Sequence, residues 1–162
     1  MSIDPLLLLL RRKARQSHQE LAELLSMTSE EVSAKVAAWE KDGTILGYQA
    51  VVDPEPLGNQ DVSAFIEVKL TPERGGGFDR LAQRIARFEQ VVSCYLASGG
   101  YDLMVVVEGG DLREVARFVA EKLSSMDGVL STATHFRLKT YKENGFMFGG
   151  EGEGADRLAV TP

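Results

Sequence analysis

The feature that most constrains the fold is a break near the first third of the chain, DPEPLGNQD at residues 53–61. Two prolines and a glycine prevent a continuous helix through this segment. Apolar residues before the break recur at helical spacing, whereas the residues after it alternate between strand and helix patterns. We therefore predict a helical domain over residues 1–53, a hinge over 54–61, an α/β domain over 62–141 and a tail over 142–162.

Residues 1–53 carry the start and stop signals of three helices. Asp4 before Pro5 is typical of a helix start, and the basic run RRKAR at residues 11–15 is favourable at a helix C-terminus. Two capping boxes follow, in which a hydroxyl residue precedes a glutamate by three positions: Ser17 with Glu20, and Thr28 with Glu31. These signals place the second helix after Ser17 and the third after Thr28.

The second and third of these helices have the outline of a helix-turn-helix. Ala22 supplies a small residue where two helices would cross closely, and Gly43 is placed to end the third helix. The residues that would anchor the third helix recur at helical spacing: Val32, Val36 and Trp39. The next segment, TILGYQAVVD at residues 44–53, is rich in β-formers, and we predict a strand or hairpin arm there.

The second part of the chain reads strand, helix, strand, strand, helix, strand. VSAFIEVKL at 62–70 alternates cleanly, and FDRLAQRIARFE at 78–89 has one apolar helical face. Gly99 and Gly100 separate two strands as in a hairpin. A second helix over 111–123 precedes the last strand, over 129–141. This order is the split βαβ, or ferredoxin-like, pattern, so the predicted fold class is α+β with two helices on one sheet face.

The other face of this sheet is also apolar. LMVVV at 103–107 is apolar on both sides of its strand, and Phe65 points opposite to the remaining apolar residues of its own strand. Such a face is not usually left in water. We predict that the same face of a second subunit covers it; the alternative is that the chain's own tail does so. The tail is glycine-rich and acidic, with a small strand predicted at 146–148 and mobility from Gly149 onward.

Composition excludes several classes of protein. The net charge of −6 excludes a generic, strongly basic nucleic-acid binder, so DNA binding would rest on a local surface. The longest apolar run, five leucines at 6–10, is far shorter than the roughly 20 residues that span a bilayer. A single cysteine, Cys94, excludes an intramolecular disulfide framework. These features predict a soluble, cytoplasmic protein with no membrane partner.

The sequence gives no support for catalysis or a metal centre. His18 and His135 are the only histidines, and they fall in different predicted domains with no partner at metal-ligand spacing. No nucleophile elbow, P-loop or dinucleotide fingerprint is present, and the triple glycine at 75–77 lacks the lysine that a P-loop requires. We expect neither an enzyme nor a cofactor.

The motifs and their order resemble the leucine-responsive/asparagine-regulator (Lrp/AsnC, feast/famine) family of transcription regulators. The resemblance covers residues 3–141 and rests on ELAELLSMTSEEVSAKVAAWEKDGTILGY, the DP that follows it, SGGYDLMVVV and VLSTATHFRLK. It implies an N-terminal winged helix-turn-helix that binds double-stranded DNA and a ferredoxin-like (RAM-type) domain that binds a small effector, often an amino acid. It also implies homodimers that associate further, commonly to octamers.

The resemblance assigns DNA contacts to the third helix and the predicted wing. The family is commonly basic at the position of Lys35, which implies a phosphate or base contact there. Ser29 and Ser33 are candidate polar contacts, and Glu30 and Ala34 share the face directed to DNA. Around the wing, the residues expected at the DNA backbone are Tyr48 and Gln49.

The charge of the predicted head is unusual for this role. Residues 1–50 hold six basic and seven acidic side chains, for a net charge of −1, although cations supply most non-specific DNA affinity. Glu31 is expected to turn back to the Thr28 amide, and Glu30 either accepts from a cytosine amino group or repels wrong DNA sites. Linkage of several heads in one assembly would then combine their weak DNA contacts into a usable affinity. The alternative is a head that contacts a protein instead of DNA.

The glycine hairpin is the candidate effector site. An amino acid requires an anion near its ammonium group and N–H donors near its carboxylate, and SGGYD at 98–102 offers both through its glycines and Asp102. By resemblance we assign Ser98, Gly99, Gly100, Tyr101 and Asp102 to the effector pocket. Two residues of the last strand are expected as neighbours from another subunit: Thr132 and Thr134. The alternative is a tight hairpin in which Asp102 acts only as a cap.

Overall fold

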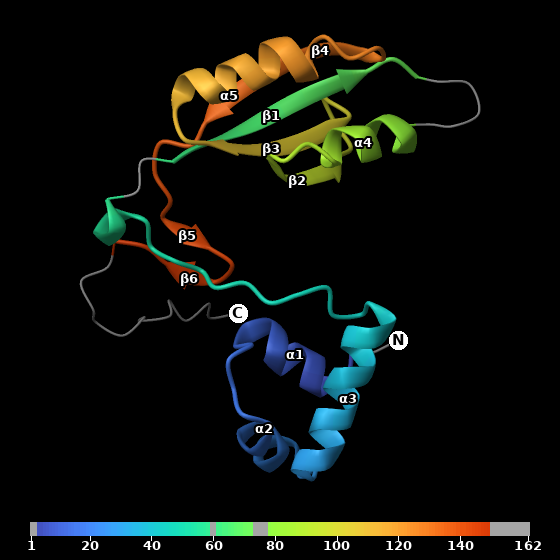
Figure 1. Ribbon diagram of the computed structural model, residues 1–162, viewed down its shortest axis with the longest axis vertical. Coiled ribbons are helices and arrows are strands. Elements are labelled where there is room, and N and C mark those ends of the chain that lie inside the picture. The colour runs from blue at the N-terminus through green and yellow to red at the C-terminus, as the bar shows by residue number, and fades with distance from the viewer. Residues whose placement is uncertain (1–2, 59–60, 73–77, 150–162) are drawn as a thin grey trace, which may run out of the picture. The chain divides into compact units, whose positions relative to one another are not determined.

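The computed structural model describes residues 3–58, 61–72 and 78–149 and divides the chain into two compact units (Figure 1). The first unit ends at Ala50 and the second begins at Val51. Each unit has its own apolar cluster of buried side chains. Separate cores are what a hinge between two domains requires.

The first unit consists of three helices: α1 (Pro5–Arg12), α2 (His18–Leu25) and α3 (Ser29–Asp42). They enclose a small apolar core whose buried members come from all three: Leu6, Leu10, Leu21, Ala22, Val32 and Val36. Ala22 is buried in this core together with Val32 and Val36, in agreement with the predicted close crossing of α2 and α3. Trp39 packs against the edge of the same core.

Local side-chain caps set where these helices begin. Asp4 accepts a hydrogen bond from the Leu6 amide (2.9 Å), with Pro5 in the first turn. Both predicted capping boxes are formed, and in the second the Thr28 amide donates to the Glu31 carboxylate over 2.8 Å. Gly43 ends α3 in the left-handed region, at φ +80°, where a residue without Cβ is strongly favoured. The predictions of helix starts and of this stop are confirmed.

The strand or hairpin arm predicted over residues 44–53 is not formed. The segment is extended without regular secondary structure. Ile45 packs against the core of the first unit, whereas Leu46 (95%), Tyr48 (54%) and Val52 (56%) are exposed. A strand needs a second row of backbone groups to pair with, and the described part of this chain supplies none to these residues. The β-rich composition therefore indicated a tendency to form a strand, but a single chain provides no partner strand for this segment.

The second unit is built on a four-stranded antiparallel sheet. Along the chain its elements are β1 (Val62–Leu70), α4 (Asp79–Ala86), β2 (Val91–Leu96), β3 (Leu103–Gly109), α5 (Leu112–Phe118), the π-helical turn η2 (Val119–Leu123) and β4 (Val129–Phe136). The spatial order is β2-β3-β1-β4. This is the predicted βαββαβ pattern, with β1 as a central strand paired on both sides.

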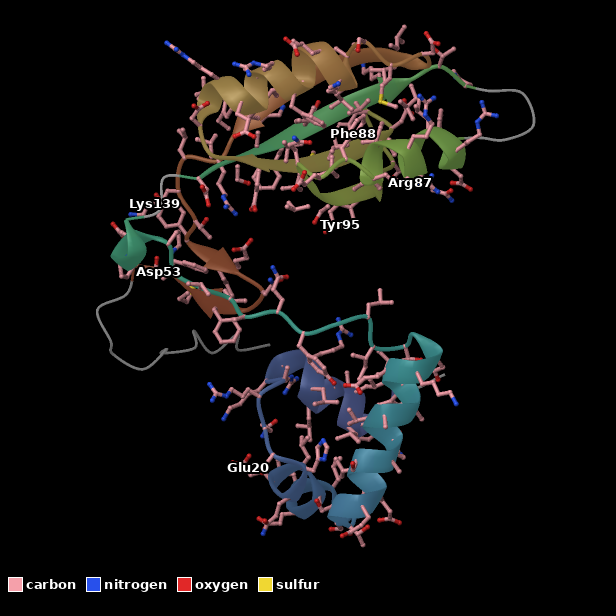
Figure 2. All side chains as sticks on the ribbon, in the orientation of Figure 1. Glu20, Asp53, Arg87, Phe88, Tyr95 and Lys139 are labelled. Atoms are coloured by element: carbon pink, nitrogen blue, oxygen red, sulfur yellow. The ribbon has the colours of Figure 1, made fainter. Side chains whose placement is uncertain are left out.

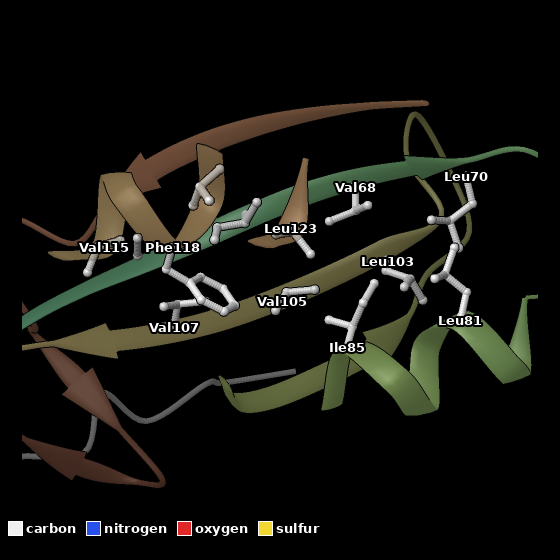
Figure 3. Packing of buried hydrophobic residues seen from close by; sticks show 13 residues of the cluster. Val68, Leu70, Leu81, Ile85, Leu103, Val105, Val107, Val115, Phe118 and Leu123 are labelled. Atoms are coloured by element: carbon white, nitrogen blue, oxygen red, sulfur yellow. The ribbon is translucent and has the colours of Figure 1, made fainter. Parts of the chain in front are cut away.

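The core of this unit lies between the sheet and its two helices (Figure 3). Alternate residues of β1 and β3 point into it, including Ile66, Val68 and Val105, all fully buried. Ile85 of α4 and Leu123 of η2 close over them from the helix side. Both helices therefore cover the same face. Phe88, just after α4, and Phe118 of α5 make an edge-to-face contact, with their ring centroids 5.3 Å apart.

The opposite sheet face, here called the outer face, carries a band of apolar side chains. Strand register places Phe65 of β1 opposite Val106 of β3, and Tyr95 of β2 opposite Met104 of β3. We define the outer face by Phe65, Tyr95, Met104, Val106 and Ala133. Phe65 remains 38% exposed and Tyr95 58% exposed, so the described part of the tail does not seal this face.

The last strand is shorter than predicted. The sequence predicts that residues 137–141 continue it, but β4 ends at Phe136, which pairs with Ala64 near the start of β1. Beyond that point the Arg137 N–H still donates to the Ser63 carbonyl (2.8 Å), but β1 begins at Val62 and offers no partner further on, and Leu138 is 95% exposed. The chain also forms a 3₁₀ turn, η1 (Glu55–Leu57), and a small hairpin of β5 (Lys142–Glu143) and β6 (Phe146–Met147), which confirms a short strand near 146. The predicted mobility beyond Gly149 and the loop at 75–77 lie outside the described residues.

Candidate DNA-binding and effector surfaces

The helix α3 presents a polar face away from its core. Val32 and Val36 are buried against α2, so helical periodicity leaves Glu30, Ser33 and Ala34 exposed and Ser29 partly buried. Glu31 belongs to the capping box, so its carboxylate is bonded to the Thr28 amide as expected. The acid that remains free to meet a duplex on this turn is Glu30.

Lys35, the expected cationic contact, is engaged within the chain. Its Nζ lies 2.8 Å from Oδ2 of Asp4, the residue that caps α1, with side-chain exposures of 44% and 30%. The hydrogen bond from Lys35 lowers the pKa of Asp4, with a further contribution from the Leu6 amide. The same Nζ lies 5.8 Å from the centre of the Trp39 ring. The charge of Lys35 is therefore offset, and this interaction joins residues 31 positions apart.

Tyr48 and Gln49, expected on a wing, lie in the extended segment after α3. The Tyr48 hydroxyl donates to Oε1 of Glu40 at 2.8 Å, which ties this segment to the last turns of α3. Burial, and after it the hydrogen bond with Glu40, raises the pKa of Tyr48. Gln49 is exposed. The structure thus brings Tyr48 to the C-terminal part of α3, while Gln49 makes no hydrogen bond to a described residue.

The SGGYD hairpin connects β2 to β3 at one end of the sheet. Gly99 adopts φ +138°, and a Cβ added at Gly99 or Gly100 would meet no atom within 4 Å. Ser98 is exposed and Tyr101 is partly buried. The two glycines therefore leave open space above the turn, as an approaching ligand or neighbouring chain would need.

Asp102 has a structural role in this hairpin. Its backbone N–H donates to the Val68 carbonyl at 3.0 Å, and its Oδ2 accepts from the Leu70 N–H at 2.7 Å. The carboxylate replaces the backbone acceptor that β3 no longer supplies to the end of β1. The sequence left open a capping role within the hairpin, whereas the amide that Asp102 caps is that of Leu70 in β1, and this bond occupies one carboxylate oxygen.

Thr132 and Thr134 do not lie with the hairpin in a single chain. They pair with Val68 and Ile66 on the other side of β1, and Thr132 Oγ1 is 2.9 Å from Ser124 Oγ. β4 and β3 are separated by β1, so about 10 Å lies between these backbones. A shallow groove on the helix side, between the end of α4 and α5, contains none of the predicted effector residues; it is lined by Phe88, Gln90, Glu114, Arg117, Phe118, Glu121 and Lys122 (Figure 2 labels Phe88).

Neither histidine belongs to a metal-ligand group, and within residues 3–58, 61–72 and 78–149 no three suitable side chains gather around one point. His135 pairs with Glu67 on the outer face, with Nε2 and Oε1 3.3 Å apart. No described helix is both long and apolar enough to cross a bilayer.

Comparison with known proteins agrees with this architecture. Residues 63–146 match the model of the Lrp/AsnC ligand binding domain. The chain is 43% identical over 155 residues to the HTH-type transcriptional regulator YugG of Bacillus subtilis, covering 95% of this chain and 93% of that protein. A feast or famine regulatory protein of M. tuberculosis, complexed with L-methionine, is 25% identical with a TM-score of 0.66, covering 85% and 91%. AsnC of E. coli shares the fold, with a TM-score of 0.65 at 23% identity over 88% and 97%.

A helix-turn-helix unit followed by a split βαβ sheet with a ligand-binding family match defines a transcription regulator, not an enzyme. More specifically, this chain belongs to the Lrp/AsnC family of transcriptional regulators. The resemblance inferred from the helix-turn-helix, hairpin and last-strand motifs is confirmed.

The structural role of Asp102 leads to a direct prediction. Asp102→Ala removes the acceptor of the Leu70 N–H, and an unsatisfied amide at this partly buried position should destabilise the second unit by about 1–3 kcal/mol. Hydrogen exchange at the Leu70 amide, followed by NMR, should become faster, while Asp102→Asn retains an acceptor oxygen and most of the protection. Asp127→Ala, at an exposed acid, is the control. Equal Leu70 exchange in Asp102→Ala and the parent protein would contradict this role.

Proposed function

We propose that this regulator binds double-stranded DNA sequence-specifically through α3, pairs through its outer face, and responds to an amino acid or a related small metabolite. The paired chains are expected to associate further, up to octamers, in the cytoplasm where the DNA lies. The single observation that carries the proposal is the coexistence of a capped, exposed α3 with an uncovered apolar sheet face. One supplies a surface that fits the major groove, and the other a means of linking two such surfaces.

Two features of the chain support a homodimer. The outer face presents Phe65 and Tyr95 to solvent. Exposed apolar bands of this kind usually mark sites of contact with another protein surface. Residues 44–53 form an extended segment with exposed Leu46 and Val52 and no strand partner among the described residues. A second copy offers both the matching sheet face and an identical extended segment for pairing.

For DNA recognition we propose the exposed part of α3 and the segment that follows it. The contacting residues are Ser29, Glu30, Ser33, Ala34, Lys35, Tyr48 and Gln49. Ser29 and Ser33 are suited to either base or phosphate, and Glu30 can accept from the amino group of cytosine. Small side chains at Ala34 and its neighbours allow close approach of the helix to base edges. Each head alone holds few cationic contacts, so linkage of heads within the assembly is needed for useful affinity.

For the effector we propose the SGGYD hairpin together with β4 of a neighbouring chain. Ser98, Gly99, Gly100, Tyr101 and Asp102 would form one wall, with Thr132 and Thr134 as neighbours from another subunit. A relative at 25% identity is complexed with L-methionine, which supports an amino acid as the ligand class. Because Asp102 Oδ2 is bonded to the Leu70 amide, its other oxygen is the one we assign to the ligand's ammonium group.

A second function is favoured by the electrostatics of the head. Residues 1–50 carry a net charge of −1, and Lys35 is paired with Asp4. A head of this charge is suited to contact a protein, with the second unit acting as a ligand-binding dimer. The two functions differ in whether the full-length protein binds a duplex.

Fluorescence anisotropy with the upstream region of the protein's own gene separates these functions. We expect micromolar binding at about 50 mM salt, tighter than to a scrambled duplex of equal composition, with weakening at about 200 mM salt. Addition of individual amino acids should shift the affinity for at least one of them, through linkage between the two sites. Failure to bind either duplex at low salt would leave the protein-binding head, and indifference to every amino acid would overturn the effector proposal.

Breaking the Asp4–Lys35 pair should strengthen DNA binding, whereas most substitutions in a binding surface weaken it. Asp4→Asn retains an N-cap, since asparagine caps a helix as well as aspartate, but removes the charge that offsets Lys35. DNA affinity should rise at low salt, and the slope of log K against log salt should steepen by about 0.9 for each additional phosphate that Lys35 neutralises.

Ser17→Asn is a matched control for Asp4→Asn, because it exchanges one N-cap for another without changing charge. Fluorescence of Trp39, the only tryptophan, reports whether the head remains folded. Unchanged affinity and slope in Asp4→Asn would show that Lys35 does not reach the duplex.

A further inference from the structure

The densest positive charge of the head lies outside α3. Arg11, Arg12, Lys13 and Arg15, here called the basic segment, are four of the six cations in residues 1–50. All four are exposed, at the end of α1 and in the loop that leads to α2. Among the described residues, none of them forms a salt bridge within 4.0 Å. Their charge is therefore available to an external anion.

Glu20, an acid close to the basic segment, already accepts hydrogen bonds within the head. Glu20, labelled in Figure 2, accepts from both the amide and the hydroxyl of Ser17 through Oε2, at 2.7 and 2.9 Å. These bonds are the main causes that lower the pKa of Glu20, and the charge of Lys13 is the smallest. The capping box thus holds the Glu20 carboxylate against the start of α2, where its charge acts on Lys13 without forming a salt bridge to any of the four cations.

On α3, in contrast to the basic segment, acids outnumber lysines and Lys35 is paired. Lys35 is paired with Asp4 at 2.8 Å, while Glu30, Glu40 and Asp42 are exposed along the helix. Neutralisation of phosphate by lysine and arginine supplies sequence-independent DNA affinity. α3 carries four acids against two lysines, Lys35 and Lys41, so it is poorly suited to bind phosphate, although its small and polar side chains suit base edges.

The position of the basic segment matches the path of the DNA backbone. When the second helix of a helix-turn-helix lies in the major groove, the first helix crosses the backbone, and the basic segment leads directly into that first helix, α2. Asp4, the N-cap of α1, contacts Lys35 of α3, and the basic segment begins at Arg11, seven residues or about 10 Å further along the helix. The major groove is about 12 Å wide, so this separation is compatible with α3 in the groove and the basic segment at a bordering phosphate strand.

We infer that the basic segment is the phosphate-binding edge of the head, and that affinity and sequence discrimination are carried by different elements. Arg11, Arg12, Lys13 and Arg15 hold the DNA backbone, and α3 discriminates between base sequences. This inference rests on the proposed DNA-binding function. It explains how a head with a net charge of −1 engages a polyanion, because its positive charge is concentrated on one edge.

Two double variants of the full-length chain test this division: Lys13→Gln with Arg15→Gln in the loop, and Arg11→Gln with Arg12→Gln at the end of α1. The probes are the upstream duplex and its scrambled counterpart, each titrated over a range of salt concentrations. Removal of these cations should weaken binding to both duplexes by the same factor, several-fold at low salt. The slope of log K against log salt should become shallower by about 0.9 for each phosphate that is no longer neutralised.

Matched controls separate this effect from a general loss of charge or fold. Arg80→Gln with Arg84→Gln removes the same charge from exposed positions of α4 in the other unit, and should leave binding unchanged. Lys13→Arg with Arg15→Lys preserves charge and should retain binding to both duplexes. Trp39 fluorescence and circular dichroism confirm that each head is folded.

The outcomes are distinct. Basic-segment variants that bind like the α4 control, while the parent protein binds normally, would overturn this inference and leave the proposed function standing. A loss confined to the upstream duplex would also overturn it, because it would assign base recognition to the basic segment. Failure of the parent protein to bind any duplex would overturn the proposed function and this inference with it.

Discussion

The structure depends on the burial of both faces of one small sheet. β1 pairs with β3 on one side and β4 on the other. Phe65 of β1 and Met104 and Val106 of β3 give the outer face apolar side chains, while the other apolar residues of both strands point inward. α4, α5 and η2 seal the inner face around Ile66, Val68 and Val105. The outer face has no such cover within the described chain, and Phe65 and Tyr95 remain exposed there. Two-layer domains are stable when each apolar face has a partner, and the proposed partner is a second copy.

The need to cover the outer face links the sheet to the proposed DNA binding by the head, residues 1–50. The head is small, its cations lie mostly at and just beyond the end of α1, and its α3 carries a paired lysine and several exposed acids. A single head of this kind is expected to bind DNA weakly, and the contributions of several heads combine only when another element holds them together. The proposed pairing through the outer face would provide that link. An effector bound at the hairpin of one chain and β4 of another would then act on the association of chains, and through it on the spacing of heads.

Local features of this fold could be predicted from the sequence, because they are set by residues a few positions apart. The Asp4 cap, the two capping boxes, the Gly43 stop and the strand alternation of β1 all involve neighbours along the chain. The order of strands followed from hydrophobic periodicity and the Gly99-Gly100 hairpin. The family follows from the same motifs in sequence, and comparison with relatives confirms it.

What could not be predicted depends on distant partners. The Lys35–Asp4 pair joins residues 31 positions apart, and the Asp102–Leu70 bond joins residues 32 apart, so no local pattern indicates either. The predicted arm at 44–53 and the end of β4 failed for a related reason, since a strand exists only where a second strand is available to pair with it. The candidate effector residues are divided between the two sides of β1, and a single chain does not bring them together.

The central claim is that the outer face is covered by another copy of the chain. Sedimentation velocity of the full-length protein at micromolar concentration measures this directly. The account predicts a species of at least twice the chain mass of 17.7 kDa, and a shift toward the single-chain mass in Phe65→Glu, which places a charge on the central strand of the outer face. A parent protein that sediments as a folded single chain across the micromolar range would contradict it.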